Sequence, residues 1–424
     1  MLALLLACSL AQPTSPELPA PNLKASVEKR SKVLGWPDDK LPVAPPGFTV
    51  SLFAKDLVSP RWLYLLPNGD VAVAEALSRV GEAYSFTKTG SLEAAKHVFE
   101  ASNRITLFRN YAGGTPLFRE KLVTGLNAPF GMLQQGDSFY VSCTDGVLRF
   151  PYQPGQTHLQ GKGEKILALP ASGYHGHWTR NLVPSPDGKH FFVTVGSSTN
   201  DAEKGMAVEA RRANILEVDP DGTNEEVFAS GLRNPVGTAF YPGSDVLWTA
   251  VNERDNLGDD VPPDYLTHVE RGAFYGWPYS YFGQHVDPRQ LGKRPDMVAK
   301  AVVPDYPLGA HTASLGLAFY PPTGGSFPTH YAGGAFIGQH GSWNRSVLTG
   351  YQVAYVPFSQ GKPSGPIEPF LTGFIANPAK YEVYGRPVGV LVLTDGSLLV
   401  ADDAGNRIWR IRANAAPVAP AQAR

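Results

Sequence analysis

Apolar and polar positions alternate along the chain in a unit that recurs. Each copy opens with polar residues, enters a short apolar run, turns at a glycine-containing segment and enters a second apolar run. Short apolar runs bounded by turn residues are typical of β-strands. A unit repeated at intervals is typical of propellers and other repeat folds. Six copies are present, and they begin at Arg61, Asn127, Gly173, Arg233, His311 and Arg386.

The copies also resemble one another in sequence. The segment GLNAPFG at residues 125–131 returns as GLRNPVG at residues 231–237. Further apolar runs between the copies supply third and fourth strands, at residues 105–108 and 121–123, 215–218 and 226–228, and 352–355 and 369–371. Four strands per unit and six units predict an all-β fold, a six-bladed β-propeller of four-stranded blades.

The two ends of this repeat are complementary. The last unit ends with an apolar run at residues 407–412 and lacks a fourth strand, whereas residues 48–53 precede the first unit without a partner. An unpaired strand edge invites aggregation. We therefore predict that this N-terminal strand completes the last blade and closes the propeller, which spans residues 47–413.

Two long connections interrupt the repeat. Residues 77–103 are predicted to contain a short helix near residues 91–100, and residues 272–310 form an aromatic, proline-bearing excursion. Connections of this length in a compact fold are usually lids or binding loops. We expect them to mark the functional face.

The termini differ in composition from the repeat. Residues 1–11 read as a secretory signal peptide or as a bacterial lipoprotein signal, in which Cys8 would become a lipidated N-terminus. Residues 12–46 are predicted to be a tether, disordered because of their proline and charge content, and residues 414–424 a disordered tail. These features predict a secreted or periplasmic protein, either soluble or anchored to the membrane as a lipoprotein.

Composition narrows the function classes. Charged residues make up only 18% of the chain, while 44 glycines and 38 prolines favour many short strands and turns. A net charge of −1 gives no basic field for nucleic acid. Of the two cysteines only Cys143 lies in the body of the chain, which excludes a disulfide framework and a CxxC metal or haem site.

The polar residues that open each copy form the first candidate site. Because the first strand of every propeller blade lines the axis, these residues are expected to meet at the channel mouth. Two arginine charges about 4 Å apart repel by roughly 4 kcal/mol at an effective dielectric near 20. An arginine cluster therefore favours an anionic guest, the alternative being that each arginine braces neighbouring blades. The candidates are Arg61, Asn127, His177, Arg180, Asn181, Arg233, Asn234, His311 and Arg386.

A second cluster follows the fourth copy. Residues 252–260 combine carboxylates, asparagines and turn carbonyls, which suit a hard cation such as Ca²⁺, although a solvated acidic turn is the alternative. His175 and His177 fall on one face of an extended segment but have no third ligand, so zinc is not expected. The chain has no GxGxxG after a strand, and Ser314 lacks the first glycine of a nucleophile elbow.

Four segments carry a more specific signal. They are His177 ahead of LVPSPDG at residues 182–188, GLRNP at 231–235, the segment from Asn252 to Asp260 leading into YGWP at 275–278, and RPVG at 386–389. Over roughly residues 47–412 the chain resembles the soluble quinoprotein glucose/sorbosone dehydrogenases. These are six-bladed propellers that use pyrroloquinoline quinone (PQQ) with Ca²⁺.

The resemblance implies a function and roles for individual residues. It implies oxidation of a sugar or a related alcohol or aldehyde by hydride transfer to PQQ, with an external electron acceptor. His177 would be the general base, and Arg233 would stabilise charge on the quinone. Asn234 would contact the quinone and Arg386 a PQQ carboxylate. Main-chain carbonyls near Arg254 and Asp255 would hold the Ca²⁺.

The chain also departs from the family's pattern. Members close to the glucose enzymes place a lysine and an additional arginine on the cofactor, where this chain offers His340, Arg345 or Tyr384. We assign His340 and Arg345 to cofactor binding, together with the residues Arg61, Asn127 and His311 that enter the strands. The aromatic candidates for stacking on cofactor or sugar, each of which could instead be packed in the core, are Tyr275, Trp277, Tyr279 and Trp343.

Two other functions remain open from the sequence. One is a Ca²⁺-dependent propeller lactonase or esterase, which would need side-chain carboxylates and asparagines from several blades on the metal. The other is a non-enzymatic propeller that serves as a surface binding module. An arginine-rich mouth favours the dehydrogenase over the lactonase or esterase.

Overall fold

The computed structural model describes residues 16–24, 27–79, 82, 91–111, 114–171 and 177–414. The predicted signal with Cys8, His175 and residues 415–424 of the predicted tail lie outside these ranges. Within the ranges, no helix has the length and apolar character needed to cross a membrane.

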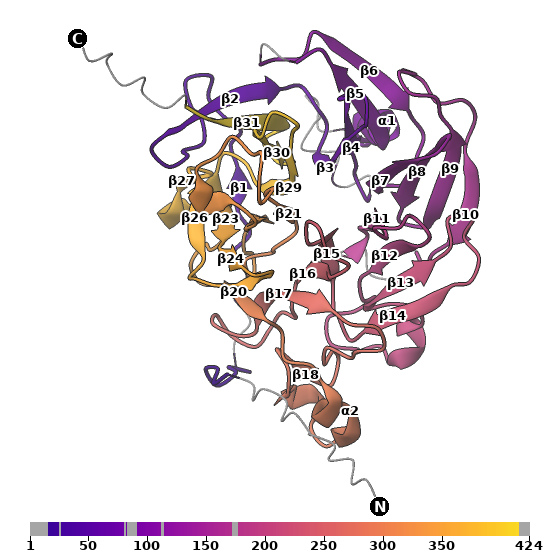
Figure 1. Ribbon diagram of the computed structural model, residues 1–424. Helices are drawn as coiled ribbons and strands as arrows, with labels where there is room; N and C mark the ends of the chain where they lie inside the picture. The colour runs from indigo at the N-terminus through magenta and orange to yellow at the C-terminus, as the bar shows by residue number, and fades with distance from the viewer. Residues whose placement is uncertain are drawn as a thin grey trace, which may run out of the picture.

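The described chain is nearly all β-structure with few helices, as predicted, and its main sheets are arranged around a common centre (Figure 1). Six of these sheets have four antiparallel strands each. The first contains β3 (Pro60–Leu65), β4 (Val71–Glu75), β5 (Arg104–Arg109) and β6 (Phe118–Val123). The second contains β7 (Pro129–Gln135), β8 (Ser138–Cys143), β9 (Gly146–Pro151) and β10 (Glu164–Ala168). The third contains β11 (Leu182–Pro184), β12 (Phe191–Val195), β13 (Asn214–Val218) and β14 (Glu226–Ser230).

The other three sheets follow the same plan. The fourth contains β15 (Pro235–Phe240), β16 (Leu247–Val251), β17 (Pro263–Val269) and β20 (Tyr306–Ala310). The fifth contains β21 (Ala318–Phe319), β22 (Ala335–Gln339), β23 (Gln352–Val356) and β26 (Glu368–Leu371). The sixth contains β29 (Pro387–Val392), β30 (Leu398–Asp402), β31 (Arg407–Ala413) and β2 (Phe48–Ala54).

The first strand of each repeat lies toward the centre. These inner strands contact one another in chain order, from β3 through β7, β11, β15 and β21 to β29, and β29 also contacts β3. Glycines allow this close approach. A Cβ on Gly237 would lie 2.7 Å from the backbone nitrogen of Leu317, and one on Gly389 would lie 2.6 Å from the carbonyl oxygen of Arg61. Residue positions at the start of different inner strands are therefore brought close together.

Strand β2 joins the two ends of the chain. It pairs antiparallel with β31, from Phe48 opposite Ala413 to Ala54 opposite Ile408. Phe53 is fully buried in an apolar cluster that takes residues from both the first and the sixth sheet, including Val73 and Leu399. The segment therefore contributes backbone pairing and core packing at once.

Deletion of residues 47–54 is expected to prevent soluble folding. It would leave the edge of β31 unpaired and would remove the buried Phe53 side chain. Phe53→Ala keeps the strand, so it should stay soluble and lose about 3–5 kcal/mol of stability. Soluble yield and thermal melting followed by circular dichroism measure both effects. A soluble deletion variant with an unchanged melting temperature would contradict this prediction.

The N-terminal segment differs from the disordered tether predicted for residues 12–46. Strand β1 (Lys32–Val33) pairs with β28 (Glu382–Val383), which pairs in turn with β27 (Ile375–Asn377). The Trp36 indole is only 6% exposed, and its Nε1 donates a hydrogen bond to Asp402 Oδ2 at 2.6 Å. The composition of residues 12–46 predicted disorder because it contains no information about the distant residues that bury Trp36.

The predicted helix in residues 77–103 is confirmed as α1 (Leu92–Ala101), whose first turn is capped by the Ser91 hydroxyl. The 272–310 excursion contains α2 and a short hairpin and projects from the edge of the molecule (Figure 1). Its elements are β18 (Ser280–Tyr281), β19 (His285–Val286), η4 (Pro288–Gln290) and α2 (Pro295–Lys300). The remaining short elements are η3 (Met206–Glu209), η5 (Thr329–Tyr331), β24 (Phe358–Ser359), β25 (Lys362–Pro363) and η6 (Pro378–Lys380).

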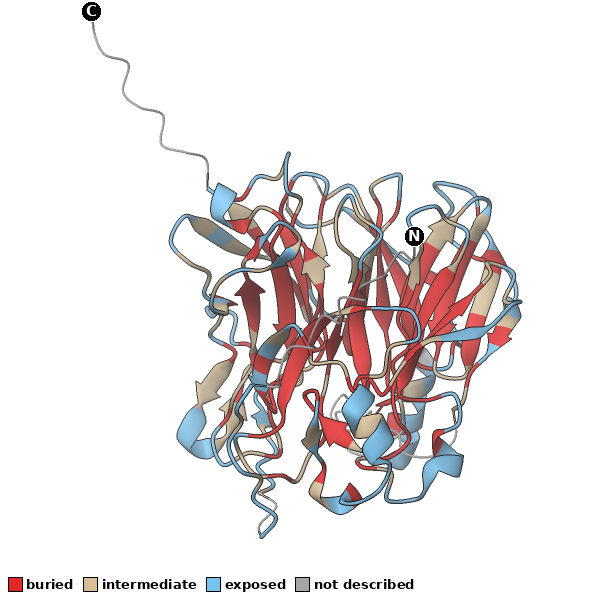
Figure 2. Ribbon diagram, turned by 60° about the horizontal axis from the view of Figure 1, so that its bottom comes forward, coloured by how far each residue is buried: buried red, intermediate tan, exposed pale blue. Residues whose placement is uncertain are grey.

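Buried side chains lie along the strands of the main sheets, and exposed residues gather in the connections and helices (Figure 2). Apolar clusters join neighbouring sheets. Trp62 of β3, for example, packs against Phe130 of β7, with their ring centroids 4.6 Å apart. Such packing fixes the relative positions of the inner strands, and with them the residues that precede those strands.

Candidate active site

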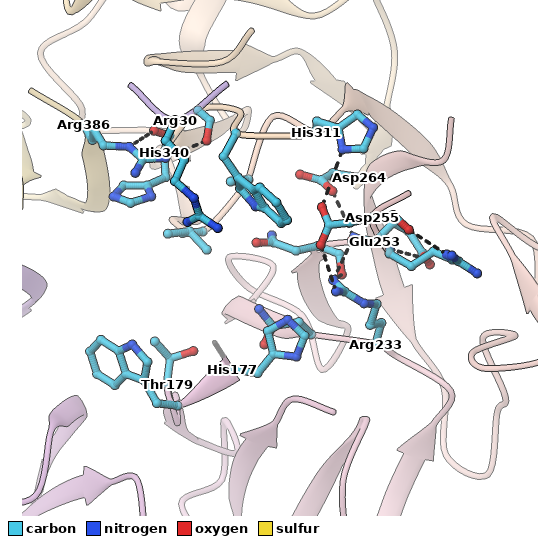
Figure 3. A pocket seen from close by; sticks show the side chains of 18 of the residues that line it. Arg30, His177, Thr179, Arg233, Glu253, Asp255, Asp264, His311, His340 and Arg386 are labelled. Atoms are coloured by element: carbon cyan, nitrogen blue, oxygen red, sulfur yellow. Dashed lines mark hydrogen bonds and ion pairs between the residues drawn. The ribbon is translucent and has the colours of Figure 1, made fainter. Parts of the chain in front are cut away.

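A cavity of about 680 Å³ lies where the inner strands begin and the second strands end. This volume falls in the range of about 300–1,000 Å³ typical of small-molecule sites. Figure 3 shows side chains from several sheets around it. Of the residues assigned to the site from the sequence, those that line it are Arg61, His177, Arg233, Asn234, Arg254, Asp255, His311, His340 and Arg386.

Two assigned cofactor-binding residues lie elsewhere. Asn127 is exposed and does not line the cavity. Arg345 is also outside the lining, and it donates hydrogen bonds to the carbonyl oxygen of Asp259 at 2.7 Å and to Asp260 Oδ1 at 3.0 Å. Among the other candidates, Tyr384 packs on Trp36 and Asn181 donates to the carbonyl oxygen of Val236 on the next inner strand at 2.9 Å. The Asn181 side chain therefore links two neighbouring inner strands.

Of the four aromatic candidates, three also lie outside the cavity lining. Tyr275 is fully buried and its hydroxyl donates to the carbonyl oxygen of His268, while Trp277 is 3% exposed and its Nε1 donates to the carbonyl oxygen of Asn200. Tyr279 does not line the cavity, but Trp343 does. Trp343 is thus the one of these four that is placed to meet a ligand in this cavity.

His177 lies just before β11 and is 7% exposed. Its Nδ1 lies 3.0 Å from the carbonyl oxygen of Ser197 and 3.0 Å from the Ser197 hydroxyl. Because a carbonyl only accepts hydrogen bonds, Nδ1 carries the proton in this contact, which places the basic lone pair on Nε2. Burial, and then the charge of Arg233, lower the pKa of His177 to about 3. The neutral form that a general base requires is therefore the stable one.

A titration of the ligand-free protein by histidine ¹⁵N NMR should show this directly. His177 is expected to stay neutral, as the Nδ1–H tautomer, at every pH above about 4, because burial and Arg233 oppose its protonation. His268 is an internal control, because its pKa is shifted in the opposite direction. The carboxylate of Asp305 binds its Nδ1 at 2.6 Å and raises its pKa. Protonation of His177 near pH 6 would contradict the prediction.

Arg233 is held from several sides and is 3% exposed. Its Nη1 donates to the carbonyl oxygen of Glu253 at 2.6 Å and its Nη2 to Asn200 Oδ1 at 2.8 Å, and it forms an ion pair with Asp255 at 3.3 Å. Asp255 also lies 3.7 Å from His311 Nδ1. Burial alone would raise the pKa of Asp255, but His311 and Arg233 hold it below its ordinary value. The ionised Asp255 carboxylate therefore contacts both Arg233 and His311.

Arg386 enters the cavity just before β29. Its Nε donates to the carbonyl oxygen of His340 at 2.9 Å and its Nη2 to that of Gly341 at 2.7 Å, and the guanidinium lies 5.4 Å from the centre of the Tyr351 ring. No carboxylate in the described part of the chain forms an ion pair with it. Its orientation is thus fixed by carbonyls while its charge is left for a ligand.

Arg61 and His340 share one carboxylate. Asp403 forms an ion pair with Arg61, and its two oxygens lie 2.9 and 3.0 Å from His340 Nε2. Burial opposes the ionisation of Asp403, but its contacts with His340 and Arg61 hold its pKa below the usual range. Burial, and then the charge of Arg386, lower the pKa of His340 to about 4. His340 is therefore neutral near pH 7 and adds no positive charge to this wall.

Sequence reasoning missed Asp264 in the lining and treated Glu253 only as one carboxylate of the cluster at residues 252–260. Burial raises the pKa of Glu253 to about 7 and that of Asp264 to about 6. Asp264 accepts hydrogen bonds from the backbone N–H of Ser314 and the hydroxyl of Thr312, at 2.9 and 3.0 Å. It stands at the start of β17, where an aspartate directly after two prolines reads as a turn residue. Its interruption of an otherwise apolar strand was the available signal.

The carbonyl assigned to Ca²⁺ already has partners. The Asp255 carbonyl oxygen accepts hydrogen bonds from Arg254 Nε at 3.0 Å and Asn200 Nδ2 at 3.1 Å, which use both of its lone pairs. The Arg254 side chain is buried between Asp287 and Asp201, at 2.5 and 3.1 Å. Among the described residues, no group of three or more His, Cys, Asp or Glu side chains is arranged to hold a metal ion. Calcium stays a prediction.

The lining suits a polar anion. Arg61, Arg233 and Arg386 come from three different sheets and share the cavity. One further donor, Arg61 Nε, and one acceptor, Asn234 Oδ1, are buried and make no hydrogen bond. Such groups are costly unless a ligand or water meets them. The donors of the cavity therefore fit a guest with several carboxylates.

Comparison with known proteins gives the family. A family model described as TrAA12-like matches residues 42–270 and 285–414. The chain belongs to the TrAA12-like family. This confirms the family resemblance inferred from the sequence motifs. An uncharacterized protein of Borreliella burgdorferi is 30% identical to this TrAA12-like chain over 296 residues, which are 68% of this chain and 76% of that protein. Aldose sugar dehydrogenase YliI of Escherichia coli is 27% identical over 148 residues, 32% of this chain and 38% of that protein.

Solved structures share the fold of this TrAA12-like chain. The iodide structure of Trichoderma reesei Carbohydrate-Active Enzymes Family AA12 has a TM-score of 0.71 and 20% identity, and the match covers 91% of this chain and 100% of that one. The holo form of the pyranose dehydrogenase PQQ domain from Coprinopsis cinerea has a TM-score of 0.69 and 20% identity, over 92% and 99% of the two chains.

Proposed function

We propose that this protein is a sugar dehydrogenase that uses PQQ as its cofactor and passes electrons to an external acceptor. The observation that carries the proposal is the meeting of a neutral His177 with Arg233 and Arg386 in one cavity of a TrAA12-like chain. We also propose that the six sheets act as the blades of a closed propeller, because their inner strands contact one another in order and β29 contacts β3.

The residues present fit PQQ, a flat tricarboxylate. Arg386 and Arg61 would bind carboxylates through paired hydrogen bonds, and Asn234 would meet a polar edge. When bound, PQQ accepts the hydride that the sugar carbon releases. His311 would act through Asp255. It helps to keep the Asp255 carboxylate ionised, and that carboxylate pairs with Arg233. His340 would help to hold Arg61 through Asp403.

The chain's own chemistry centres on His177. Its Nδ1–H is fixed on the Ser197 carbonyl, so Nε2 is the atom that would take the proton of the substrate hydroxyl. Arg233 lies in the same cavity and would stabilise negative charge that develops as the proton leaves. Because Arg233 is already held by Glu253, Asn200 and Asp255, it needs no rearrangement to do so.

The names of similar proteins support the same chemistry. They include an aldose sugar dehydrogenase of Escherichia coli and a PQQ-bound aldose sugar dehydrogenase of Streptomyces coelicolor. A Ca²⁺-dependent lactonase would need several side-chain oxygens on a metal ion, whereas this lining is dominated by guanidinium groups. Whether Ca²⁺ takes part is treated as a variable of the experiment.

The test mixes purified protein with PQQ, with and without Ca²⁺, and follows reduction of an artificial electron acceptor by aldoses and alcohols. A parallel assay offers lactones and esters without PQQ. We expect PQQ-dependent dye reduction and no hydrolysis. Hydrolysis without PQQ would favour the lactonase. If the protein shows neither activity and titration with PQQ gives no heat, a binding module would be favoured.

The proposal extends to location. The apolar run at residues 1–11 supports export, so the mature protein is expected in the periplasm or outside the cell. Cell fractionation with detection of the native protein tests this, and recovery in the cytoplasm alone would contradict it.

A further inference from the structure

Arg30, from the N-terminal segment, stands at the mouth of the cavity. It lines the same space as His340 and Arg386, and the three are drawn together in Figure 3. The Arg30 side chain is 71% exposed, whereas those of Arg61 and Arg233 are 11% and 4% exposed. The cavity thus has buried cations at the strand entrances and exposed cations, Arg30 and Lys204 among them, nearer the solvent.

The fold holds Arg30 in this position. Its guanidinium lies over the Trp343 ring, 4.9 Å from the centroid, in a cation–π contact. The backbone beside it is fixed as well, since the N–H of Lys29 donates to the carbonyl oxygen of Trp343 at 2.7 Å. Asn344 Nδ2 donates to the carbonyl oxygen of Val27 at 2.9 Å. The segment that was predicted to be a disordered tether therefore forms part of the cavity wall.

The charge of Arg30 is weakly compensated by the protein. Its ion pair is with Glu28 at 3.7 Å, and that side chain is 59% exposed. Exposed pairs of this kind contribute little and are screened by salt. Among the arginines that line the cavity in the described chain, Arg61, Arg233 and Arg254 are paired with buried or half-buried carboxylates, whereas Arg386 has no carboxylate partner there and Arg30 has only this exposed one. Positive charge is thus concentrated here, and it would attract anions.

We infer that Arg30 binds a carboxylate of the substrate, so that the preferred substrates are uronic acids rather than neutral aldoses. This inference rests on the proposed function, because the buried arginines are taken to be used by the cofactor, which leaves the mouth for a second anion. The guanidinium offers a carboxylate paired hydrogen bonds, and Trp343 beside it offers an aromatic face to the sugar ring. The carboxylate takes no part in the oxidation.

The first experiment compares matched substrates in the PQQ-loaded enzyme. Glucuronate is set against glucose and glucuronamide, and galacturonate against galactose. The wild-type kcat/KM is expected to favour each acid, and Arg30→Gln to reduce the acid-to-neutral ratio by roughly 10- to 100-fold, through KM. Lys29→Gln is the matched control, because Lys29 lies over the Tyr381 ring, 5.2 Å from its centroid, and does not line the cavity. Added salt should lower the wild-type ratio.

A second experiment needs neither cofactor nor turnover. Saturation-transfer NMR measures binding of methyl glucuronide and methyl glucoside to wild type, Arg30→Gln and Lys29→Gln. Preferential binding of the glucuronide that is lost only in Arg30→Gln supports the inference. Equal binding of the two glycosides, or an Arg30→Gln variant that loses PQQ affinity but keeps its preference for acids, would overturn it. Oxidation of neutral aldoses without a preference would overturn the inference and leave the proposed function standing, whereas failure of wild type to bind PQQ would overturn the proposed function and with it the assignment of the acids as substrates.

Discussion

His177→Asn is expected to lose dye reduction by about 10²- to 10⁴-fold while it still binds PQQ. Asparagine can donate from its side-chain amide to the Ser197 carbonyl, as Nδ1 of the imidazole does now at 3.0 Å. It has no basic atom in the position of Nε2, so the substrate hydroxyl loses its proton acceptor. The loss should therefore appear in kcat, measured under saturating sugar, with little change in quinone affinity.

The control for this variant comes from the same hairpin. His190 precedes β12, is bound to Asp219 at 3.1 Å and does not line the cavity. His190→Asn should retain wild-type kcat. Full activity of His177→Asn would remove the assignment of the base, and loss of quinone binding in that variant would show that His177 acts on the cofactor instead.

The second large effect is expected for Arg386→Gln, on the affinity for PQQ. Its guanidinium makes hydrogen bonds to two backbone carbonyls and has no carboxylate partner in the described chain, so its charge is available to a ligand. Loss of a charged, paired hydrogen bond corresponds to a decrease in affinity of roughly 10- to 100-fold. Isothermal titration with PQQ measures it.

Arg345→Gln provides the comparison. The sequence assigns Arg345 to the cofactor, but the structure places it outside the cavity, on Asp259 and Asp260. Its replacement should leave the PQQ affinity within a factor of about two, since surface ion pairs contribute little. Equal losses in the two variants would contradict the cavity as the cofactor site.

The strand pattern was readable from the sequence because it follows from local chemistry. Each copy pairs its apolar runs across a glycine turn, and the turn fixes which residues start and end the strands. That is why Arg233 and Arg386, each one or two residues before an inner strand, could be placed at the mouth in advance. Their approach depends on the repeat and not on the details of any loop.

Other parts of the site depend on long-range contacts that no local pattern encodes. Asn127 stands two residues before β7 as Arg233 stands two residues before β15, yet Asn127 is exposed while Arg233 is buried in the lining. Arg345 and His340 lie close in sequence, but only His340 meets the carboxylate of Asp403, which comes from another sheet. Asp264 becomes a functional candidate only once its burial is known, and burial separates Glu253 from the other carboxylates of the cluster at residues 252–260.

The excursion at residues 272–310 shows a further limit. Its length predicted a lid or a binding loop, and the contact that links it to the cavity lining is the ion pair of Asp287 with Arg254. The N-terminal segment shows the reverse case, because its composition predicted disorder and it carries Arg30 to the mouth.

The pairing of β2 with β31 also bears on how the protein is made. Strand β2 pairs with β31, the last strand of the described chain, so the sixth sheet can be completed only after nearly the whole polypeptide has been translated. Until then the nascent chain remains an incomplete array of sheets with the edge of the sixth sheet unpaired.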